Sequence, residues 1–308
     1  MVTGTTNAPK GVFRKSAALV LALAIAAMVS TAFLAGCRRG PRTYTDGLGK
    51  TVSLEGTPKR IVSLSPALTE AVFSLGAGDR LVGVSTFCNR PPEALEIEKV
   101  GDAFTLNTEK LVSLKPDLVL VAGSRDQESQ VEKDLARLGI PAWASGPSTV
   151  AEVLQDIEAL SKVLGVEKKG EELAAELEED LEAVRAAFPE GAPRPKVFIT
   201  FDSELWTSGG GSFIDDVITA AGGANIAGDV DQQYLQLSME DLLAKDPDVI
   251  LVAIPEDEAA PLIGRPGWSS LRAVKEGRVF FPNPDLVSRP GPAVVEGIKE
   301  IAGWLRGE

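Results

Sequence analysis

Residues 108–122 read TEKLVSLKPDLVLVA, and a near-copy, MEDLLAKDPDVILVA, occupies residues 239–253, which is 131 positions further along the chain. The copies share more than apolar positions, because a glutamate, a leucine and a Pro-Asp pair stand at the same places in both. In each copy a capping residue, Asn107 or Ser238, predicts the start of a short helix, and the Pro-Asp pair predicts a turn into a buried strand. One helix-strand unit in each half of the chain predicts two similar lobes.

Short apolar runs alternate with helical stretches on both sides of these copies. The runs lie at residues 60–66, 81–85, 118–122, 142–145, 197–201 and 278–282. Strands that are apolar throughout and alternate with helices are typical of parallel sheets covered by helices on both faces. The sequence therefore predicts an α/β protein with two Rossmann-like lobes, each built on a parallel sheet.

Between the two halves, residues 150–190 show hardly any strand signal and carry apolar residues at helical spacing. A continuous helix here would reach roughly 50 Å at 1.5 Å per residue, longer than one small domain is wide. We expect a single long helix that bridges the lobes. The alternative is two ordinary helices joined at Gly165 and Gly170.

The N-terminus predicts an export signal. Three basic residues precede a continuous apolar run at residues 16–35, and small residues come before Cys37. The alternative is a membrane anchor that is retained, because the run is about long enough to span a bilayer. However, Leu34-Ala35-Gly36-Cys37 resembles the lipobox of bacterial lipoproteins. This resemblance implies that Cys37 becomes the lipidated first residue of a protein that works outside the cytoplasmic membrane.

These patterns divide the chain into five expected segments. They are a lipoprotein signal peptide (residues 1–36), a lipid-anchored tether with an N-terminal hairpin (37–58), an N-terminal α/β lobe (59–149), the bridging helix (150–190) and a C-terminal α/β lobe (191–308).

The composition excludes several classes of function. A net charge of -13 argues against a nucleic-acid binder, which needs a basic face to neutralise phosphates. Histidine is absent, which removes His-based catalytic triads and His-ligated metal or haem. The Gly-rich run at residues 206–213 lacks P-loop and dinucleotide-binding spacing, and no nucleophile-base pair can be assembled, so we expect no enzyme. With Cys37 lipidated, Cys88 has no partner and is interpreted as a small apolar filler.

Three runs together carry a family resemblance. They are KRIVSLSPALTEAVFSLGAGDRLVGVS (residues 59–85), PPEALEIEKVGDAFTLNTEKLVSLKPDLVLVA (91–122) and WTSGGGSFIDDVITAAGGANIA (206–227). They resemble the substrate-binding proteins of bacterial ABC importers for cobalamin, ferric siderophores and haem, over essentially all of the chain after about Thr43. The resemblance implies two rigid lobes bridged by a single long helix, a ligand bound in the cleft between them, and a monomer.

The same resemblance assigns a role to the repeated glutamates. In that family one exposed glutamate on each lobe docks onto arginines of the two permease subunits, and Glu109 and Glu240 fall on those motif positions. The implied partner is a permease dimer with its ATPase subunits. The alternative is ordinary helix-start chemistry, because an acid in the first turn suits the helix dipole.

Candidate ligand-binding residues lie just beyond the strand ends, where α/β sheets bind ligands. Aromatic residues make up only 6% of the chain, so their recurrence at these loops indicates a planar ligand face; the alternative is a set of hydrophobic loop plugs. Cobalamin-binding members have aromatics at the positions that match Phe87, Phe104 and Tyr234. The candidates are Phe87, Phe104, Trp206, Tyr234, Asp285 and Arg289.

The ligand that this resemblance implies is a metal chelate, and no resident cofactor or protein-bound metal is expected. A neutral or zwitterionic corrinoid such as cobalamin is favoured over a ferric siderophore, because basic side chains are few and acids surround them. Haem ranks lower, since Tyr234 would have to serve nearly alone as an axial ligand. A lipid-anchored sensor that uses the same cleft is a further alternative.

Overall fold

The computed structural model describes residues 1, 2, 4, 40–102, 106–189 and 191–308. The chain divides into two compact units, Met1–Arg42 and Thr43–Glu308, and the second unit holds both large sheets. Cys37 and the apolar run at residues 16–35 lie outside the described residues, as does Phe104. In the part of the chain that the structure describes, no helix is both long and apolar enough to cross a bilayer.

The N-terminal lobe is built on a four-stranded sheet with the order β4-β3-β5-β6, and all of its strand pairs are parallel. All residues of β3 and four of the five residues of β5 are buried, as expected for strands covered on both faces. The elements of this lobe are β3 (Ile61–Ser63), α2 (Pro66–Ser74), η1 (Gly78–Arg80), β4 (Leu81–Val84), η2 (Pro92–Glu96), α3 (Thr108–Ser113), β5 (Leu118–Ala122), α4 (Gln130–Leu138) and β6 (Ala142–Ser145).

The C-terminal lobe repeats this topology. Its sheet has the order β12-β11-β7-β9 and is also parallel throughout, so in both lobes the first and third strands lie at the centre. Its elements are β7 (Lys196–Thr200), β8 (Trp206–Thr207), α7 (Phe213–Ala220), β9 (Ala224–Asn225), β10 (Leu235–Gln236), α8 (Met239–Lys245), β11 (Val249–Val252), α9 (Glu256–Ile263), η3 (Trp268–Ser270), α10 (Arg272–Lys275), β12 (Val279–Phe280), α11 (Pro284–Ser288) and α12 (Val294–Arg306).

Two small sheets complete the described fold. Strands β1 (Arg42–Thr45) and β2 (Thr51–Leu54) pair with each other ahead of the first lobe. The turn between them docks on β6, because the amide of Gly47 donates to the carbonyl of Ala144 at 2.9 Å. Strands β8 and β10 pair antiparallel in the second lobe. The predicted α/β class, with two lobes on parallel sheets, is confirmed.

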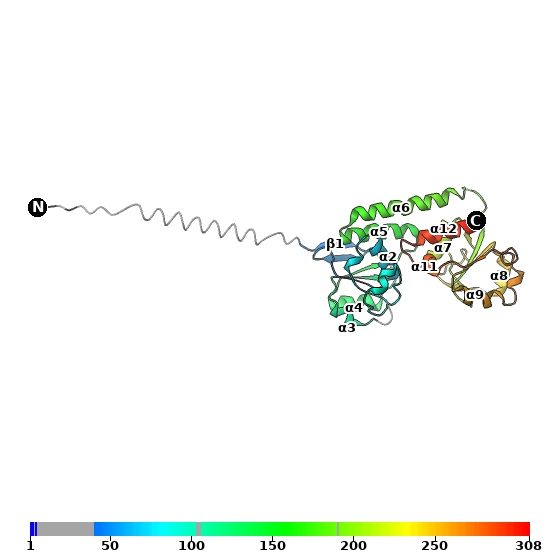
Figure 1. The fold of residues 1–308 in the computed structure, drawn as a ribbon, viewed down its shortest axis with the longest axis horizontal. Helices are drawn as coiled ribbons and strands as arrows, with labels where there is room; N and C mark the ends of the chain where they lie inside the picture. Colours follow the sequence, from blue (N-terminus) through cyan, green and yellow to red (C-terminus); the bar gives the residue numbers. More distant parts are fainter. Residues whose placement is uncertain (3, 5–39, 103–105, 190) are drawn as a thin grey trace. The chain divides into compact units, whose positions relative to one another are not determined.

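The prediction of one continuous bridging helix is wrong. Two helices, α5 (Val150–Leu164) and α6 (Glu167–Ala186), occupy this part of the chain, and α5 ends at Gly165 in the left-handed conformation with φ 66°. This backbone conformation suits glycine, because a residue with a Cβ atom is disfavoured there. The helices pack against each other, and Figure 1 shows α6 running alongside both lobes.

Both helices contribute to a hydrophobic core in each lobe. Leu173 of α6 packs on the core of the first lobe, Leu181 belongs to the core of the second, and Leu177 between them contacts both. At the crossing with α5, a side chain on Gly170 would collide with Ser161. The pair of helices therefore bridges the lobes in place of a single helix.

The Pro-Asp pairs of the repeated sequence have the same structural role in each lobe. The carboxylate of Asp117 accepts the amides of Lys59 and Arg60 at 2.8 and 3.0 Å, just before β3. The carboxylate of Asp248 accepts the amide of Lys196 at 2.7 Å, at the start of β7. Each aspartate thus fixes the turn from the short helix into the third strand against the first strand of its lobe.

Candidate functional site: a cavity between the two lobes

A cavity of about 660 Å³ lies between the lobes, at the carboxyl ends of β5, β6 and β7. From the N-terminal lobe it is lined by residues 123–126 and 146–148. From the C-terminal lobe it is lined by residues that include 212–214, 233 and 234. Small-molecule sites typically measure about 300 to 1,000 Å³ and lie at this end of parallel sheets. The cavity is therefore the principal candidate for a ligand site.

The cavity wall is polar but nearly neutral. Among the described residues that line it, the charged ones are Arg125 and Asp126, which have opposite signs. Hydroxyl groups are more frequent, and they come from Ser124, Ser148, Ser208, Ser212, Ser288 and Tyr234. The buried hydroxyl of Ser208 has no hydrogen-bond partner in the described part of the chain. A hydroxyl can both donate and accept, so this wall suits uncharged polar groups of a ligand.

Arg125 is held at the cavity wall by the first turns of α5. Its guanidinium contacts the carboxylate of Glu152 at 3.1 Å and donates to the carbonyl of Gly47 at 3.4 Å. Burial alone would raise the pKa of Glu152. The hydrogen bond from the amide of Ser148 at 2.6 Å and the charge of Arg125 lower it by more, so the pKa of Glu152 lies below its usual value. The positive charge of Arg125 is thus paired with a nearby carboxylate.

A second carboxylate lies behind the same wall. Asp156 of α5 accepts a hydrogen bond from the hydroxyl of Ser145 at 2.5 Å, at the end of β6. Burial raises its pKa to about 6, although the Ser145 hydroxyl opposes this shift. The carboxylates of Glu152 and Asp46 raise the pKa of Asp156 and Arg125 lowers it. Its ionisation therefore changes the charge at the end of β6 at mildly acidic pH.

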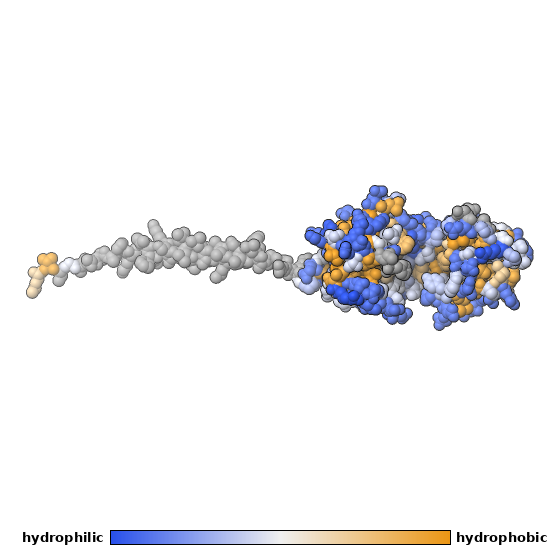
Figure 2. All heavy atoms as spheres, turned by 90° about the horizontal axis from the view of Figure 1, so that it is seen from below, coloured by the Kyte–Doolittle hydropathy of each residue, from blue (hydrophilic) through white to orange (hydrophobic). Residues whose placement is uncertain are grey.

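The structure places three of the four predicted aromatic residues. Tyr234 lines the cavity and is exposed, and Trp206 is exposed on β8, which pairs with β10, the strand directly after Tyr234. Phe87 is exposed on the loop after β4, in the other lobe. Phe104 lies outside the described residues. On the face seen in Figure 2, apolar residues are exposed in both lobes near their junction.

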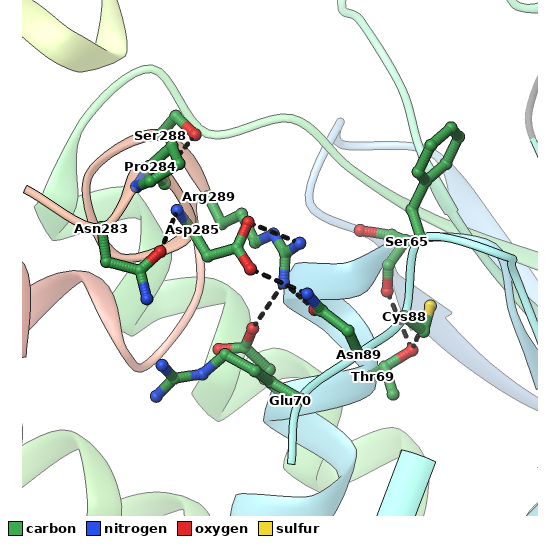
Figure 3. Close-up of polar contacts among 12 residues, drawn as sticks. Ser65, Thr69, Glu70, Cys88, Asn89, Asn283, Pro284, Asp285, Ser288 and Arg289 are labelled. Carbon is green, nitrogen blue, oxygen red and sulfur yellow. Dashed lines mark hydrogen bonds and ion pairs between the residues drawn. The ribbon is translucent and has the colours of Figure 1, made fainter. Parts of the chain in front are cut away.

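The predicted pair Asp285 and Arg289 lies at the contact between the lobes (Figure 3). The guanidinium of Arg289 is 2.7 Å from the carboxylate of Asp285, four residues earlier on α11. It also reaches the first lobe, where it lies 3.3 Å from the carboxylate of Glu70 and 2.7 Å from the amide oxygen of Asn89. Asn89 in turn donates to Asp285 at 2.9 Å. These four side chains are hereafter called the interlobe network. The charges of Asp285 and Arg289, which the sequence suggested for ligand binding, are paired within this network.

Glu70 is the most buried member of this network, with its side chain only 7% exposed. Burial raises its pKa, while the charge of Arg289 and its hydrogen bond lower it. Its sequence context predicts neither this burial nor its partner, because Arg289 stands 219 residues away. Sequence reasoning missed Glu70 and Asn89 for this reason.

Cys88 is a buried free thiol, which agrees with its interpretation as a small filler. The hydroxyl of Thr69 donates to its sulfur at 3.1 Å, and the hydroxyl of Ser85 lies 3.3 Å from it. The thiol helps to hold the loop that carries Phe87 and Asn89 against α2. It belongs to the core of the first lobe.

Glu109 and Glu240 lie away from the cavity, one on each lobe. They occupy the first turns of α3 and α8, and both are exposed. The predicted caps are present, since Asn107 accepts the amide of Lys110 at 3.0 Å and Ser238 accepts the amide of Asp241 at 3.1 Å.

Comparisons with known proteins identify the fold family. The periplasmic binding protein family matches residues 61–286. The ABC transporter substrate-binding lipoprotein YvrC of Bacillus subtilis (strain 168) is 35% identical over 268 residues, which are 85% of this chain and 84% of that protein.

Two similar solved structures are of proteins whose names specify a ligand. The periplasmic vitamin B12 binding protein of Vibrio cholerae is 31% identical, with a TM-score of 0.70 over 81% of this chain and 97% of its own. The periplasmic heme-binding protein RhuT of Roseiflexus sp. RS-1 is 26% identical, with a TM-score of 0.71 over 82% of this chain and 99% of its own.

The raised pKa of Asp156 predicts a pH-dependent stability. Between about pH 4 and about pH 6 the folded protein holds a proton that the unfolded chain has released, so stability from this group falls as the pH rises through that window. Asp156→Asn removes this dependence. We expect the melting temperature of the variant, relative to the parent, to increase from about pH 4 to about pH 7. Asp126→Asn, an exposed acid of the same cleft, is the control; identical pH profiles of the two variants contradict the assignment.

Removal of Arg289 should leave Glu70 buried without its positive partner. Arg289→Met is expected to destabilise the fold by on the order of 3 kcal/mol, and Glu70→Gln in the same chain should restore part of the loss. The defect should shrink on acidification, because protonation removes the unpaired charge of Glu70, whose pKa is already raised by burial.

Arg90→Met is the matched control for this experiment. Arg90 also pairs across the lobes, at 3.5 Å from Glu296, but Glu296 is largely exposed and such pairs contribute at most about 1 kcal/mol. Its charge also lowers the pKa of Glu70, but less than the charge and the hydrogen bond of Arg289 do. Equal effects of the two arginine substitutions on thermal denaturation refute the central role of the interlobe network.

Proposed function

The chain belongs to the periplasmic binding protein family, and we propose that it captures a corrinoid in the cavity between its lobes and delivers it to an ABC importer. It is a substrate-binding protein of the ABC-transporter class and not an enzyme, since the family and the matched relatives are transport binding proteins. Its place of action is extracytoplasmic, as for the family.

The near-neutral wall of the cavity carries the choice of ligand. A corrinoid bears many uncharged carboxamide groups around a flat macrocycle. The serine hydroxyls can pair with carboxamides, and the ring of Tyr234 in the cavity wall offers an apolar face for a macrocycle. Trp206 and Phe87 are exposed but lie outside the described lining, and the proposal places them at the edge of a ligand that extends beyond the cavity. Similarity to the vitamin B12 binding protein of Vibrio cholerae supports the same class of ligand.

A ferric siderophore is the second candidate, and the charge pairing disfavours it. Anionic siderophores require unpaired basic side chains, but Arg125 is paired with Glu152 and Arg289 with Asp285 and Glu70. Haem is disfavoured because the chain has no histidine to bind iron.

Transport requires a partner in the membrane, and we also propose which surface of the chain contacts that partner. The relative YvrC is named as an ABC transporter substrate-binding lipoprotein, which supports a permease with ATPase subunits as the partner. We assign Glu109 and Glu240 to the contact with the two permease subunits. They are exposed, one on each lobe, at equivalent positions of the repeated unit.

The proposed ligand can be tested by titration of residues 38–308, which contain the whole compact unit Thr43–Glu308. We expect cyanocobalamin or cobinamide to raise the melting temperature and to bind in calorimetry, whereas ferric siderophores and haem should not. Tyr234→Ala and Trp206→Ala should each weaken corrinoid binding by about tenfold or more. Leu138→Ala, an exposed residue of α4, should leave it unchanged. A response to a siderophore alone contradicts the corrinoid assignment.

The proposed lipid anchor on Cys37 can be tested in cells. Cys37→Ser should abolish incorporation of a labelled fatty acid into the chain, because the thiol of residue 37 carries the proposed lipid. Cys88→Ser is the control, since that thiol is buried in the fold. A parent chain that takes up no labelled fatty acid but stays in the membrane fraction argues for the retained apolar run as the anchor.

A further inference from the structure

The two copies of the helix-strand unit contain positions with a clear structural role. Leu111 of α3 and Leu242 of α8 are fully buried. Asp117 and Asp248 hold the adjacent first strand of each lobe through its backbone amides. These contacts explain why both copies contain the leucine and the aspartate. They do not explain the outer face of the two helices.

That outer face presents one acid and one aliphatic side chain in each copy. Val112 is 45% exposed and Leu243 is 38% exposed, and each stands three positions after the glutamate of its helix. Side chains three positions apart on a helix lie on the same side, so each carboxylate has an aliphatic neighbour. Within the described part of the chain, neither Glu109 nor Glu240 forms a hydrogen bond or an ion pair.

A single exposed aliphatic residue is common and needs no explanation. Beyond the N-terminal residues and the aromatics, however, the large hydrophobic side chains exposed in the described chain are Leu95, Val112, Leu138 and Leu243. Val112 and Leu243 occupy equivalent positions, 131 residues apart. This coincidence indicates a common role for the two positions that folding does not supply.

We propose that Val112 and Leu243 insert into apolar pockets on two membrane-spanning subunits of the importer, each pocket lying beside the basic group that receives the adjacent glutamate. The inference rests on the proposed function and specifies the chemistry of its docking surface. Two equivalent patches on one chain match a partner with two identical faces related by a twofold axis. A second copy of this chain fits poorly, because it would bring the same acids face to face and carries a net charge of -13.

The two components of each patch should act on different rate constants. Exposed charges steer the encounter and make association sensitive to salt, whereas buried apolar contacts mainly slow dissociation. Glu109→Gln with Glu240→Gln should therefore reduce the association rate and its salt dependence. Val112→Ser with Leu243→Ser should raise the dissociation rate by about tenfold or more and leave the salt dependence of association unchanged.

The test is a binding-kinetics measurement on the permease and ATPase subunits of the same host, purified together in lipid nanodiscs, with residues 38–308 in solution. Leu95→Ser with Leu138→Ser is the matched control, because these residues are comparably exposed but lie outside the repeated unit. Thermal denaturation and corrinoid titration of each variant should match the parent, since the substituted side chains contact neither the cores nor the cavity.

The outcomes separate this inference from the function on which it rests. Slower association of the glutamine variant together with unchanged dissociation of the serine variant overturns the apolar contacts while the docking glutamates stand. An importer that binds the parent and both variants alike overturns the whole docking surface. Sedimentation of residues 38–308 gives the remaining alternative: self-association that Val112→Ser with Leu243→Ser abolishes makes a second copy the partner and overturns the proposal.

Discussion

The packing of α5 and α6 against both lobes is the constraint on which the cavity depends. Leu177 of α6 contacts a hydrophobic core of each lobe, as does Phe213 at the start of α7. Gly170 lets the two helices approach closely at Ser161, so the bridge is a packed pair of helices and resists bending better than a loop would. A bridge of this kind favours a cavity whose shape is set before the ligand arrives.

The same constraint accounts for the distribution of charge around the cavity. With the lobes held together, Arg289 reaches Glu70 and Asn89 across the junction, and Arg125 is occupied by Glu152. Pairing in this way offsets the desolvation of each charge, which is costly when a charge is buried alone. What remains available to a ligand is a set of hydroxyls and aromatic rings. Pairing among protein groups therefore leaves little net charge at the cavity wall.

The sequence predicted local features well and long-range pairings poorly. The strand positions, the helix caps at Asn107 and Ser238, and the two lobes could be read from periodicity and capping chemistry, because these depend on neighbours in the chain. The division of the bridge at Gly165 was an open alternative, since glycine both tolerates a helix and ends one. The partnership of Arg289 with Glu70 could not be predicted, because it joins residues 219 positions apart that no local pattern connects.

The internal repeat is kept at the outer faces of α3 and α8 and lost at the cavity. Both lobes have the same strand order, and both place the repeated helix and its buried leucine in the same way. Yet the loop after β5 lines the cavity, whereas residues 254 and 255, at the start of the equivalent loop after β11, are not part of the described lining. A ligand without twofold symmetry gains nothing from two equal walls, whereas a partner with twofold symmetry needs two equal contacts. The outer faces of α3 and α8 are thus alike in the two lobes, whereas the loops that line the cavity differ between them.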